Sequence, residues 1–187
     1  MYNWKRIVIE NLPLLIATSF ISTFAGSAIE SALSLFKTYP GLLLFVPAIL
    51  DACGDIGSTF ASKTACTVHM LGPGAISLRG KYNKILFNNI VATFFSALLF
   101  FLLFTVASYI IGLSVGIAFP PLEKMLLIVL LTGSIVLLLL IVIAIVTVKI
   151  VLRSNLDPDN FGAPIVATAA DFLAANIYVF ICFIILL

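Results

Sequence analysis

The first third of the chain contains the stretch Val46-Pro-Ala-Ile-Leu-Asp-Ala-Cys-Gly-Asp-Ile-Gly-Ser-Thr-Phe-Ala-Ser-Lys63, which lies inside an apolar run long enough to cross a lipid bilayer. The stretch nevertheless holds a proline, two glycines, two aspartates and a lysine. A charged side chain in the middle of a membrane helix costs roughly 2.5–3.5 kcal/mol on insertion scales. Charged residues in such a position are therefore expected to serve a function.

The two aspartates of this stretch, Asp51 and Asp55, are four residues apart, so on a helix they share one face. The segment does not supply each acid with a basic partner of its own. The oxygen-bearing side chains of Ser58, Thr59 and Ser62 follow. Two carboxylates on one face, followed by hydroxyl groups, indicate a site for a cation.

The composition identifies the class of protein. Of the 187 residues, 63% are hydrophobic and 10% are charged, whereas a soluble domain has about 45–50% apolar and about 25% charged residues. The apolar runs are continuous, without the alternation of a β-barrel. We therefore expect an all-α integral membrane protein, in the cell membrane and in contact with membrane lipid. We expect no nucleic-acid partner.

Five membrane spans are predicted from the apolar runs and the turns between them. Lys37-Thr-Tyr-Pro-Gly41, Gly72-Pro-Gly74, Pro120-Pro121 and the polar segment Arg153-Ser-Asn-Leu-Asp-Pro-Asp-Asn160 separate the runs. The start of the chain superficially resembles a signal peptide, but its apolar stretch is too long for one, so we interpret it as a span that stays. The spans are Leu12–Phe36, Leu42–Leu71, Ile85–Leu113, Leu122–Leu152 and Ala163–Leu187. Together they predict one transmembrane domain over residues 1–187, with no cytoplasmic regulatory domain.

The lysines and arginines predict the orientation, with Lys63 left out because it lies within a span. Seven of them fall on one side of the membrane and two on the other, and basic loops usually face the cytoplasm. The N-terminus is thus expected in the cytoplasm and the C-terminus outside, in agreement with an odd number of spans. The seven are Lys5, Arg6, Arg79, Lys81, Lys84, Lys149 and Arg153, and the two are Lys37 and Lys124.

The spans differ in polarity. The first, second and fifth carry stripes of small and polar residues, which let helix backbones approach closely. The third and fourth are almost purely apolar, which suits contact with lipid. We therefore expect the first, second and fifth spans to converge and the other two to shield them.

Four acids lie within the spans: Glu30, Asp51, Asp55 and Asp171. Carboxylates that line a path select cations, so a hydrophilic cation pathway is one interpretation. The other is structural, with Lys63 in an ion pair with one acid and another acid neutral in its buried surroundings. The three cysteines, Cys53, Cys66 and Cys182, all lie within apolar segments and are expected as apolar filler rather than as a disulfide framework.

Hard oxygen ligands without cysteine or paired histidines argue against zinc and copper. Mg²⁺ and Ca²⁺ both bind carboxylates, carbonyl groups and water, and Mg²⁺ tends to retain several waters. A few acids among many small residues favour a path for a partly hydrated Mg²⁺. Mn²⁺, Co²⁺ and Ca²⁺ are the other candidate ions.

Two groups of motifs resemble a known family. Val46-Pro47, Gly54-Asp-Ile-Gly57 and Ala61-Ser-Lys63 are similar to the second transmembrane helix of the MgtE family of magnesium transporters, especially of its eukaryotic solute-carrier relatives. Asp157-Pro-Asp-Asn160, Pro164 and Ala167-Thr-Ala-Ala-Asp171 resemble the start of the fifth helix of that family. The number and order of the spans also match, and Glu30 stands where the family has an acid in its first helix.

The resemblance implies a divalent cation channel or transporter with its path at the interface of two five-helix units, and hence a homodimer of this chain. It assigns the pore carboxylate to Asp171 and a backbone carbonyl contact to Ala167. Asp51, Asp55 and Glu30 complete the expected metal ligands. The expected lining of the path is Gly54, Ser58 and Ser62 on the second span and Pro164 and Thr168 on the fifth.

The sequence departs from the family pattern at three positions. Asp55 replaces the usual asparagine after Gly54 and adds a negative charge. Lys63 replaces an arginine. Ala163 stands where bacterial members have an asparagine, which removes one oxygen ligand.

The alternative function is that of a metal-dependent intramembrane transferase. Asp51-x-x-x-Asp55 is similar to the metal–diphosphate motifs of membrane prenyltransferases, and Asp157-x-Asp159 would be the second acidic pair. Diphosphate binding calls for several basic residues near the acids, and only Lys63 is available. A purely structural subunit is a third possibility, which the cost of four acids in the membrane argues against.

Overall fold

The computed structural model describes the backbone of residues 4–72, 82–153 and 158–187, and the side chains of those residues outside 4–11, 14, 153 and 158–161. All regular structure in these ranges is helical, which confirms the predicted class. The helices, in order, are α1 (Trp4–Ser31), α2 (Leu33–Thr38), α3 (Pro40–Leu71), α4 (Asn83–Ser114), α5 (Leu122–Arg153) and α6 (Pro158–Leu186). Asp157, one of the predicted acids, lies outside the described residues.

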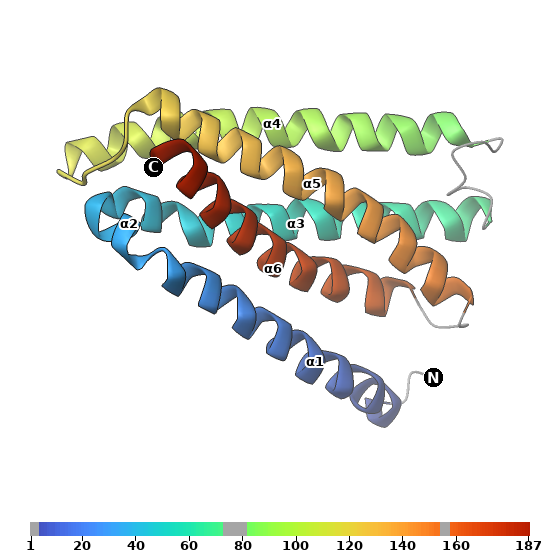
Figure 1. The fold of residues 1–187 in the computed structure, drawn as a ribbon. Coiled ribbons are helices and arrows are strands. Elements are labelled where there is room, and N and C mark those ends of the chain that lie inside the picture. Colours follow the sequence, from blue (N-terminus) through green and yellow to red (C-terminus); the bar gives the residue numbers. More distant parts are fainter. Residues whose placement is uncertain (1–3, 73–81, 154–157) are drawn as a thin grey trace.

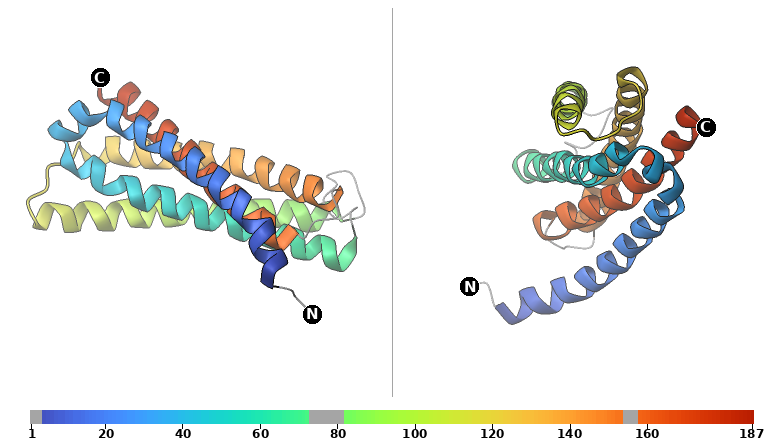
Figure 2. Two further views of the ribbon diagram at one scale, coloured as in Figure 1. Left: turned by 90° about the horizontal axis from the view of Figure 1, so that it is seen from below. Right: turned by 90° about the vertical axis from the view of Figure 1, so that its left-hand side faces the viewer.

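The five long helices run back and forth along one bundle, and the short α2 turns the chain at one end (Figure 1). The start of α1 and the end of α6 lie at opposite ends of this bundle. α6 packs against α1, α3 and α5, and α5 also packs against α3 and α4. α1 diverges from the other helices toward its N-terminal end, as the end-on view shows (Figure 2).

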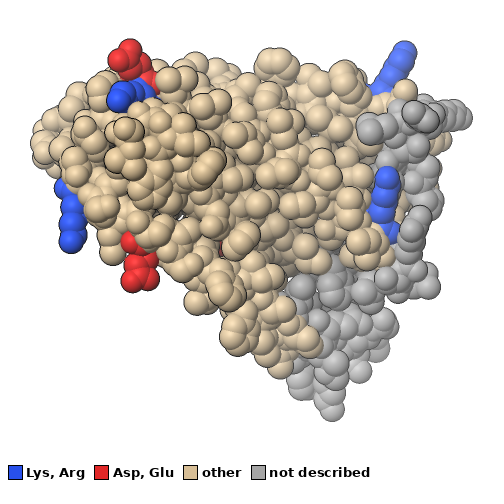
Figure 3. Space-filling view, in the orientation of Figure 1, with Lys and Arg blue, Asp and Glu red and all other residues tan. Residues whose placement is uncertain are grey.

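Four of these helices are long and apolar enough to cross a membrane, within the part of the chain that the structure describes. They are Pro40–Leu71, Asn83–Ser114, Leu122–Leu152 and Gly162–Leu186. The charged side chains visible in Figure 3 lie mainly toward the two ends of the bundle, and the wide band between them is almost entirely uncharged. Large apolar side chains of α4, such as Phe95, Leu99 and Leu103, are exposed on this bundle, as expected of a surface that faces lipid.

The C-terminal end predicted for the first span was wrong. Instead of one helix to Phe36, α1 ends at Ser31, and the separate α2 begins at Leu33. Ala32 between them is fully buried, and its backbone N–H is bonded to the carbonyl of Ile29 at 3.1 Å. The turn lets Leu35 and Phe36 join the core, a tertiary gain that apolar periodicity alone does not reveal.

The prediction that the fourth span shields the others was also wrong. α5 lies among α3, α4 and α6, and its side chains from Met125 to Val148 contribute a large part of the core. In a bilayer the lipid tails are as apolar as leucine, so hydrophobicity does not separate a lipid-facing helix from a central one. The convergence of the second and fifth spans is confirmed by the α3–α6 contact, and the first span, α1, reaches them through α6.

Two structural details differ from the expected spans without changing their order. α6 begins at Pro158, five residues before the predicted start at Ala163, so part of the expected polar loop is helical. Pro47 lies inside α3, which continues through it as one helix of 32 residues. At about 1.5 Å per residue α3 is about 48 Å long and extends beyond the ~30 Å hydrocarbon core of a bilayer.

A glycine fixes how closely α3 approaches its neighbours. A Cβ atom at Gly57 would lie 2.9 Å from Cγ1 of Val166 on α6 and 3.1 Å from Cδ1 of Leu140 on α5. Both distances are shorter than ordinary van der Waals contacts. The missing side chain of Gly57 therefore allows three helices to meet at one point.

A hydrogen bond joins the N-terminal end of α3 to α6. The buried Tyr178 hydroxyl donates a hydrogen bond of 2.8 Å to the backbone carbonyl of Leu42. Nearby, the ring of Phe119, in the segment between α4 and α5, occupies the space that Cβ atoms at Gly41 and Gly112 would need. These contacts hold the N-terminal end of α3 against the rest of the bundle.

We expect Gly57→Ala to destabilise the protein by about 1–3 kcal/mol, because the added methyl group must displace the branched, stiff Val166. Gly54→Ala is the matched control, since a Cβ at Gly54 would meet no atom within 4 Å. Thermal unfolding in detergent, followed by circular dichroism, measures both variants. Equal melting temperatures for the two variants would contradict the close contact at Gly57.

Tyr178→Phe removes only the hydroxyl that binds the Leu42 carbonyl. We expect the free energy of unfolding to fall by about 0.6–1.7 kcal/mol, from the average to the maximum for hydrogen bonds between the helices of a membrane protein. Denaturant titration in mixed micelles measures the change, with Phe180→Tyr as a control that alters an exposed ring on the same helix. A Tyr178→Phe variant as stable as the original protein would show that this hydrogen bond adds nothing.

Candidate functional site

The central acid of the bundle is Asp171, which is half-buried and lies one residue from the middle of α6. Its carboxylate oxygen Oδ2 accepts a hydrogen bond of 3.4 Å from the hydroxyl of Ser22 on α1. The polar stripe of α1 consists of Ser19, Ser22, Thr23, Gly26 and Glu30. Of these described residues, only Ser22 has a side chain that bonds outside α1. Its neighbours Ser19 and Thr23 donate to carbonyls of their own helix.

The crossing of α3 and α6 brings a second acid to the level of Asp171. α3 and α6 run in opposite directions (Figure 1), and Gly57 faces Val166 at their contact. Asp171 is five residues beyond Val166, so it stands at the level of residue 52 on α3. Asp51 is one residue from that level.

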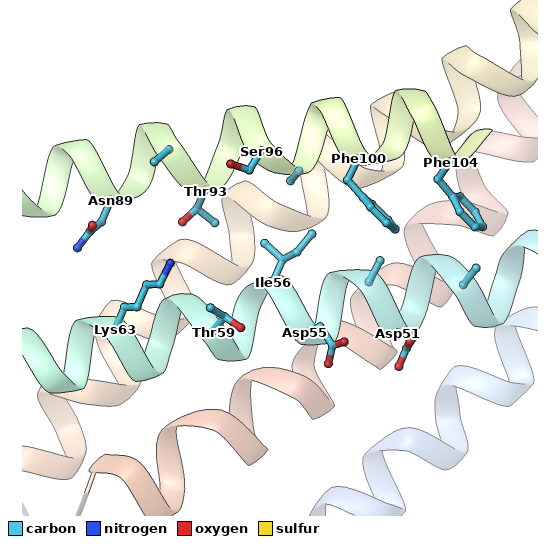
Figure 4. A pocket seen from close by; sticks show the side chains of 14 residues that line it. Asp51, Asp55, Ile56, Thr59, Lys63, Asn89, Thr93, Ser96, Phe100 and Phe104 are labelled. Atoms are coloured by element: carbon cyan, nitrogen blue, oxygen red, sulfur yellow. The ribbon is translucent and has the colours of Figure 1, made fainter. Parts of the chain in front are cut away.

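The acids of α3 are exposed on the surface of the single chain. Asp51 and Asp55 extend from α3 away from α4 (Figure 4). Lys63, also exposed, extends from α3 toward α4. Within the described residues, Lys63 forms no ion pair with either acid. The structure thus gives no support to the expectation that Lys63 neutralises one of them.

The expected lining residues lie at a spacing of three or four along their helices. Pro164, Ala167, Thr168 and Asp171 share one face of α6, and the Thr168 hydroxyl is bonded to the Pro164 carbonyl at 2.9 Å. On α3, Gly54 is buried, Ser58 is half-buried and Ser62 is exposed. Ser58 donates to the backbone carbonyl of Asp55 at 3.1 Å.

Glu30 stands apart from these residues. It is exposed near the end of α1, one residue before the helix ends, whereas Ser22 contacts Asp171 two turns earlier. Within the described residues no group of three or more histidine, cysteine, aspartate and glutamate side chains is arranged to hold a metal ion. Among the described acids, Asp51 rather than Glu30 stands at the level of Asp171.

Sequence reasoning singled out Asp171 and Asp51 as candidate ligands but did not pair Asp171 with Ser22. The signal was present, because Ser22 belongs to the polar stripe of the first span. The sequence did not show the angle at which α1 crosses α6.

Comparison with known proteins gives the class of function. The family model for MgtE, a divalent cation transporter, matches residues 46–181, which include the α3 and α6 motifs together with Asp171. No curated protein and no solved structure matches the chain. The family consists of cation transporters rather than enzymes, so the intramembrane transferase built on Asp51-x-x-x-Asp55 is not supported. The chain belongs to the MgtE family of divalent cation transporters.

Proposed function

We propose that the chain forms a homodimeric pathway for partly hydrated Mg²⁺, with the α3 and α6 faces of two copies opposed across the path. The observation that carries this proposal is the exposure of Asp51 and Asp55 at the middle of α3, beside the half-buried Asp171. Carboxylates in mid-membrane are too costly to face lipid. A second copy, with water and cations between the two, would cover them.

The acids have graded roles in this proposal. Asp171, at the middle of α6 and oriented by Ser22, is the central ligand, and its equivalent in the second copy would face it. Ala167, one turn earlier on the same face, would offer its carbonyl to the hydrated ion. Asp51 and Asp55 would concentrate cations along the path, and Glu30 would act near one mouth.

The remaining small residues would keep the path wide. A Cβ at Gly54 would meet nothing within 4 Å, so packing within one copy does not require a glycine there. Room at this position suits a path for an ion that retains its waters. Ser58, Ser62, Pro164 and Thr168 would line the rest of the path.

The proposed orientation follows from the basic residues. Lys84 at the start of α4 and Lys149 near the end of α5 lie at the same end of the bundle as the N-terminus of α1. Placed by the positive-inside rule, this end faces the cytoplasm and the C-terminus of α6 faces outward. The path would then run from the outer side, past Asp171, to the cytoplasm.

We expect Asp171→Asn to lower Mg²⁺ flux at least tenfold, because the amide keeps the volume of the side chain but removes the charge that the ion meets at mid-membrane. Uptake into proteoliposomes with an internal Mg²⁺-sensitive dye measures the flux. Glu123→Gln, in the first turn of α5 and away from the acids of the path, is the charge-matched control.

Chemical cross-linking of the same proteoliposomes reports whether the Asp171→Asn protein is still a dimer. Undiminished flux in that variant would remove Asp171 from the path. Flux that survives in a strictly monomeric protein would instead contradict the dimeric pathway.

Asp55→Asn tests the charge at the position where relatives carry asparagine. Asp55 has no ion pair among the described residues, so its loss is expected to leave stability within about 0.5 kcal/mol. We expect transport to persist, with a half-saturating Mg²⁺ concentration raised by up to about tenfold, because one attractive charge is lost. A Mg²⁺ titration of initial uptake rates at constant ionic strength measures this shift, and an unchanged value would exclude Asp55 from attracting the ion.

A further inference from the structure

A second feature of α3 lies on the side that faces α4. A cavity of about 610 Å³ separates the two helices, and α4 contributes Asn89, Thr93, Ser96 and Phe100 to its lining. Lys63, which extends from α3 toward α4, lies near Asn89 at one end (Figure 4). Phe100 and Phe104 line the other end. We call this cavity the α3–α4 groove.

The polar groups of the groove lack partners within the chain. Most serines and threonines in the described helices donate to a backbone carbonyl three or four residues earlier, as Thr64 and Thr105 do. Among the described residues, Thr59, Thr93, Ser96 and Asn89 make no side-chain hydrogen bond, and Lys63 makes no ion pair. In a membrane such unsatisfied donors are unfavourable, so a polar ligand is expected beside them.

The groove changes from polar to apolar with depth. If α3 is centred in the bilayer, Lys63, eight residues from its end, lies about 3 Å inside the boundary of the hydrocarbon core. By the same measure Phe100 on α4 lies about 16 Å inside, near the bilayer centre. Lys63 thus stands near the headgroup level, Thr93, Thr59 and Ser96 follow about 6–10 Å inside the hydrocarbon core, and the aromatic rings stand at the level of acyl chains.

We propose that the α3–α4 groove binds an anionic phospholipid from the leaflet at the C-terminal end of α3. The phosphate would accept hydrogen bonds from Lys63, Asn89 and Thr93, and an acyl chain would lie along Phe100 and Phe104. Basic pockets between transmembrane helices are known recognition sites for anionic headgroups. Asp51 and Asp55 also line the groove, but they extend from α3 away from α4 and lie toward the end opposite Lys63, so the proposed headgroup position is set apart from these two acids.

A lipid fits the groove better than a free anion or a second copy of the chain. The side chains of α4 beside the groove are exposed and apolar, with Leu99 at 57% and Leu103 at 60%, so the groove adjoins the lipid phase. A free anion would leave the apolar end empty. A second copy would need an acid to meet Lys63, whereas a phospholipid supplies both the negative charge and the apolar chain.

The acids at the edge of the groove do not prevent this binding. Asp55 and Asp51 also contribute to the lining, but they are eight and twelve residues from Lys63, or about 12 Å and about 18 Å along α3. Thr59 lies between the acids and Lys63. The positive end of the groove is therefore set apart from the acidic end by about two helical turns.

Native mass spectrometry of the purified protein tests this site. The protein is delipidated and then titrated with phosphatidylglycerol or phosphatidylcholine of identical acyl chains. We expect one tightly held phosphatidylglycerol per chain and at least fivefold weaker retention of phosphatidylcholine. Lys63→Gln is expected to weaken phosphatidylglycerol binding by about fivefold, and Lys63→Arg is expected to restore it.

Lys149→Gln is the matched control, because it removes an exposed positive charge at the same end of the bundle but outside the groove. Equal losses in Lys149→Gln and Lys63→Gln would overturn the proposal, since binding would then reflect the net charge alone. Equal retention of the two lipids would contradict recognition of the anionic headgroup and would leave the groove as an apolar surface for acyl chains. Displacement of the lipid by inorganic phosphate would indicate a free-anion site instead.

A second readout does not depend on removing Lys63. Phe100→Trp places a fluorophore at the apolar end of the groove, where brominated phosphatidylglycerol should quench it more strongly than brominated phosphatidylcholine. Equal quenching by the two lipids would contradict selective binding. Efficient disulfide cross-linking of two chains through Thr93→Cys would show that a second copy, rather than a lipid, fills the groove.

Discussion

The close approach of α3 to α5 and α6 at Gly57 is the contact on which the rest of the structure depends. In a bilayer, helices gain no hydrophobic free energy by leaving lipid for one another, so their association relies on close packing. Gly57 permits that packing against Val166 and Leu140. The same contact fixes the register between α3 and α6, and the register places Asp51 at the level of Asp171. A side chain at Gly57 would therefore change the path as well as the stability.

The register also explains how one chain can hold several acids at membrane depth. Asp171 lies within reach of the Ser22 hydroxyl, while Asp51 and Asp55 project from the open side of α3. One protomer leaves these charges incompletely solvated, which is unfavourable in lipid. The arrangement becomes reasonable when a second copy and the hydrated ion complete the surroundings. In the proposed dimer the acids would act as half of a site, and dimer formation and cation binding would stabilise each other.

Much of the fold could be predicted from the sequence because apolar runs and turn residues determine where membrane helices begin and end. α3 to α5 end within a few residues of their expected limits, and the motifs around Asp55 and Asp171 pointed to the family that the comparison then showed. The break at Ala32 and the central place of α5 could not be predicted. Both depend on which apolar surfaces meet, and in lipid an apolar side chain gives no sign of whether its neighbour is protein or acyl chain.

The candidate site, too, could be predicted from the sequence only in part. The spacing of Asp51 and Asp55 was enough to place them on one face, but it could not show that Lys63 extends the other way. Lys63 is eight residues, or about 80° of helical rotation, from Asp55, so sequence distance alone suggested that the two charges might pair. Asp51 and Asp55 extend away from α4 and Lys63 extends toward it, so the Lys63 end of the α3–α4 groove can suit an anion although both acids also line the groove. One helix can therefore present opposite charges at membrane depth without their neutralising each other, which an ion pair between Asp55 and Lys63 would have prevented.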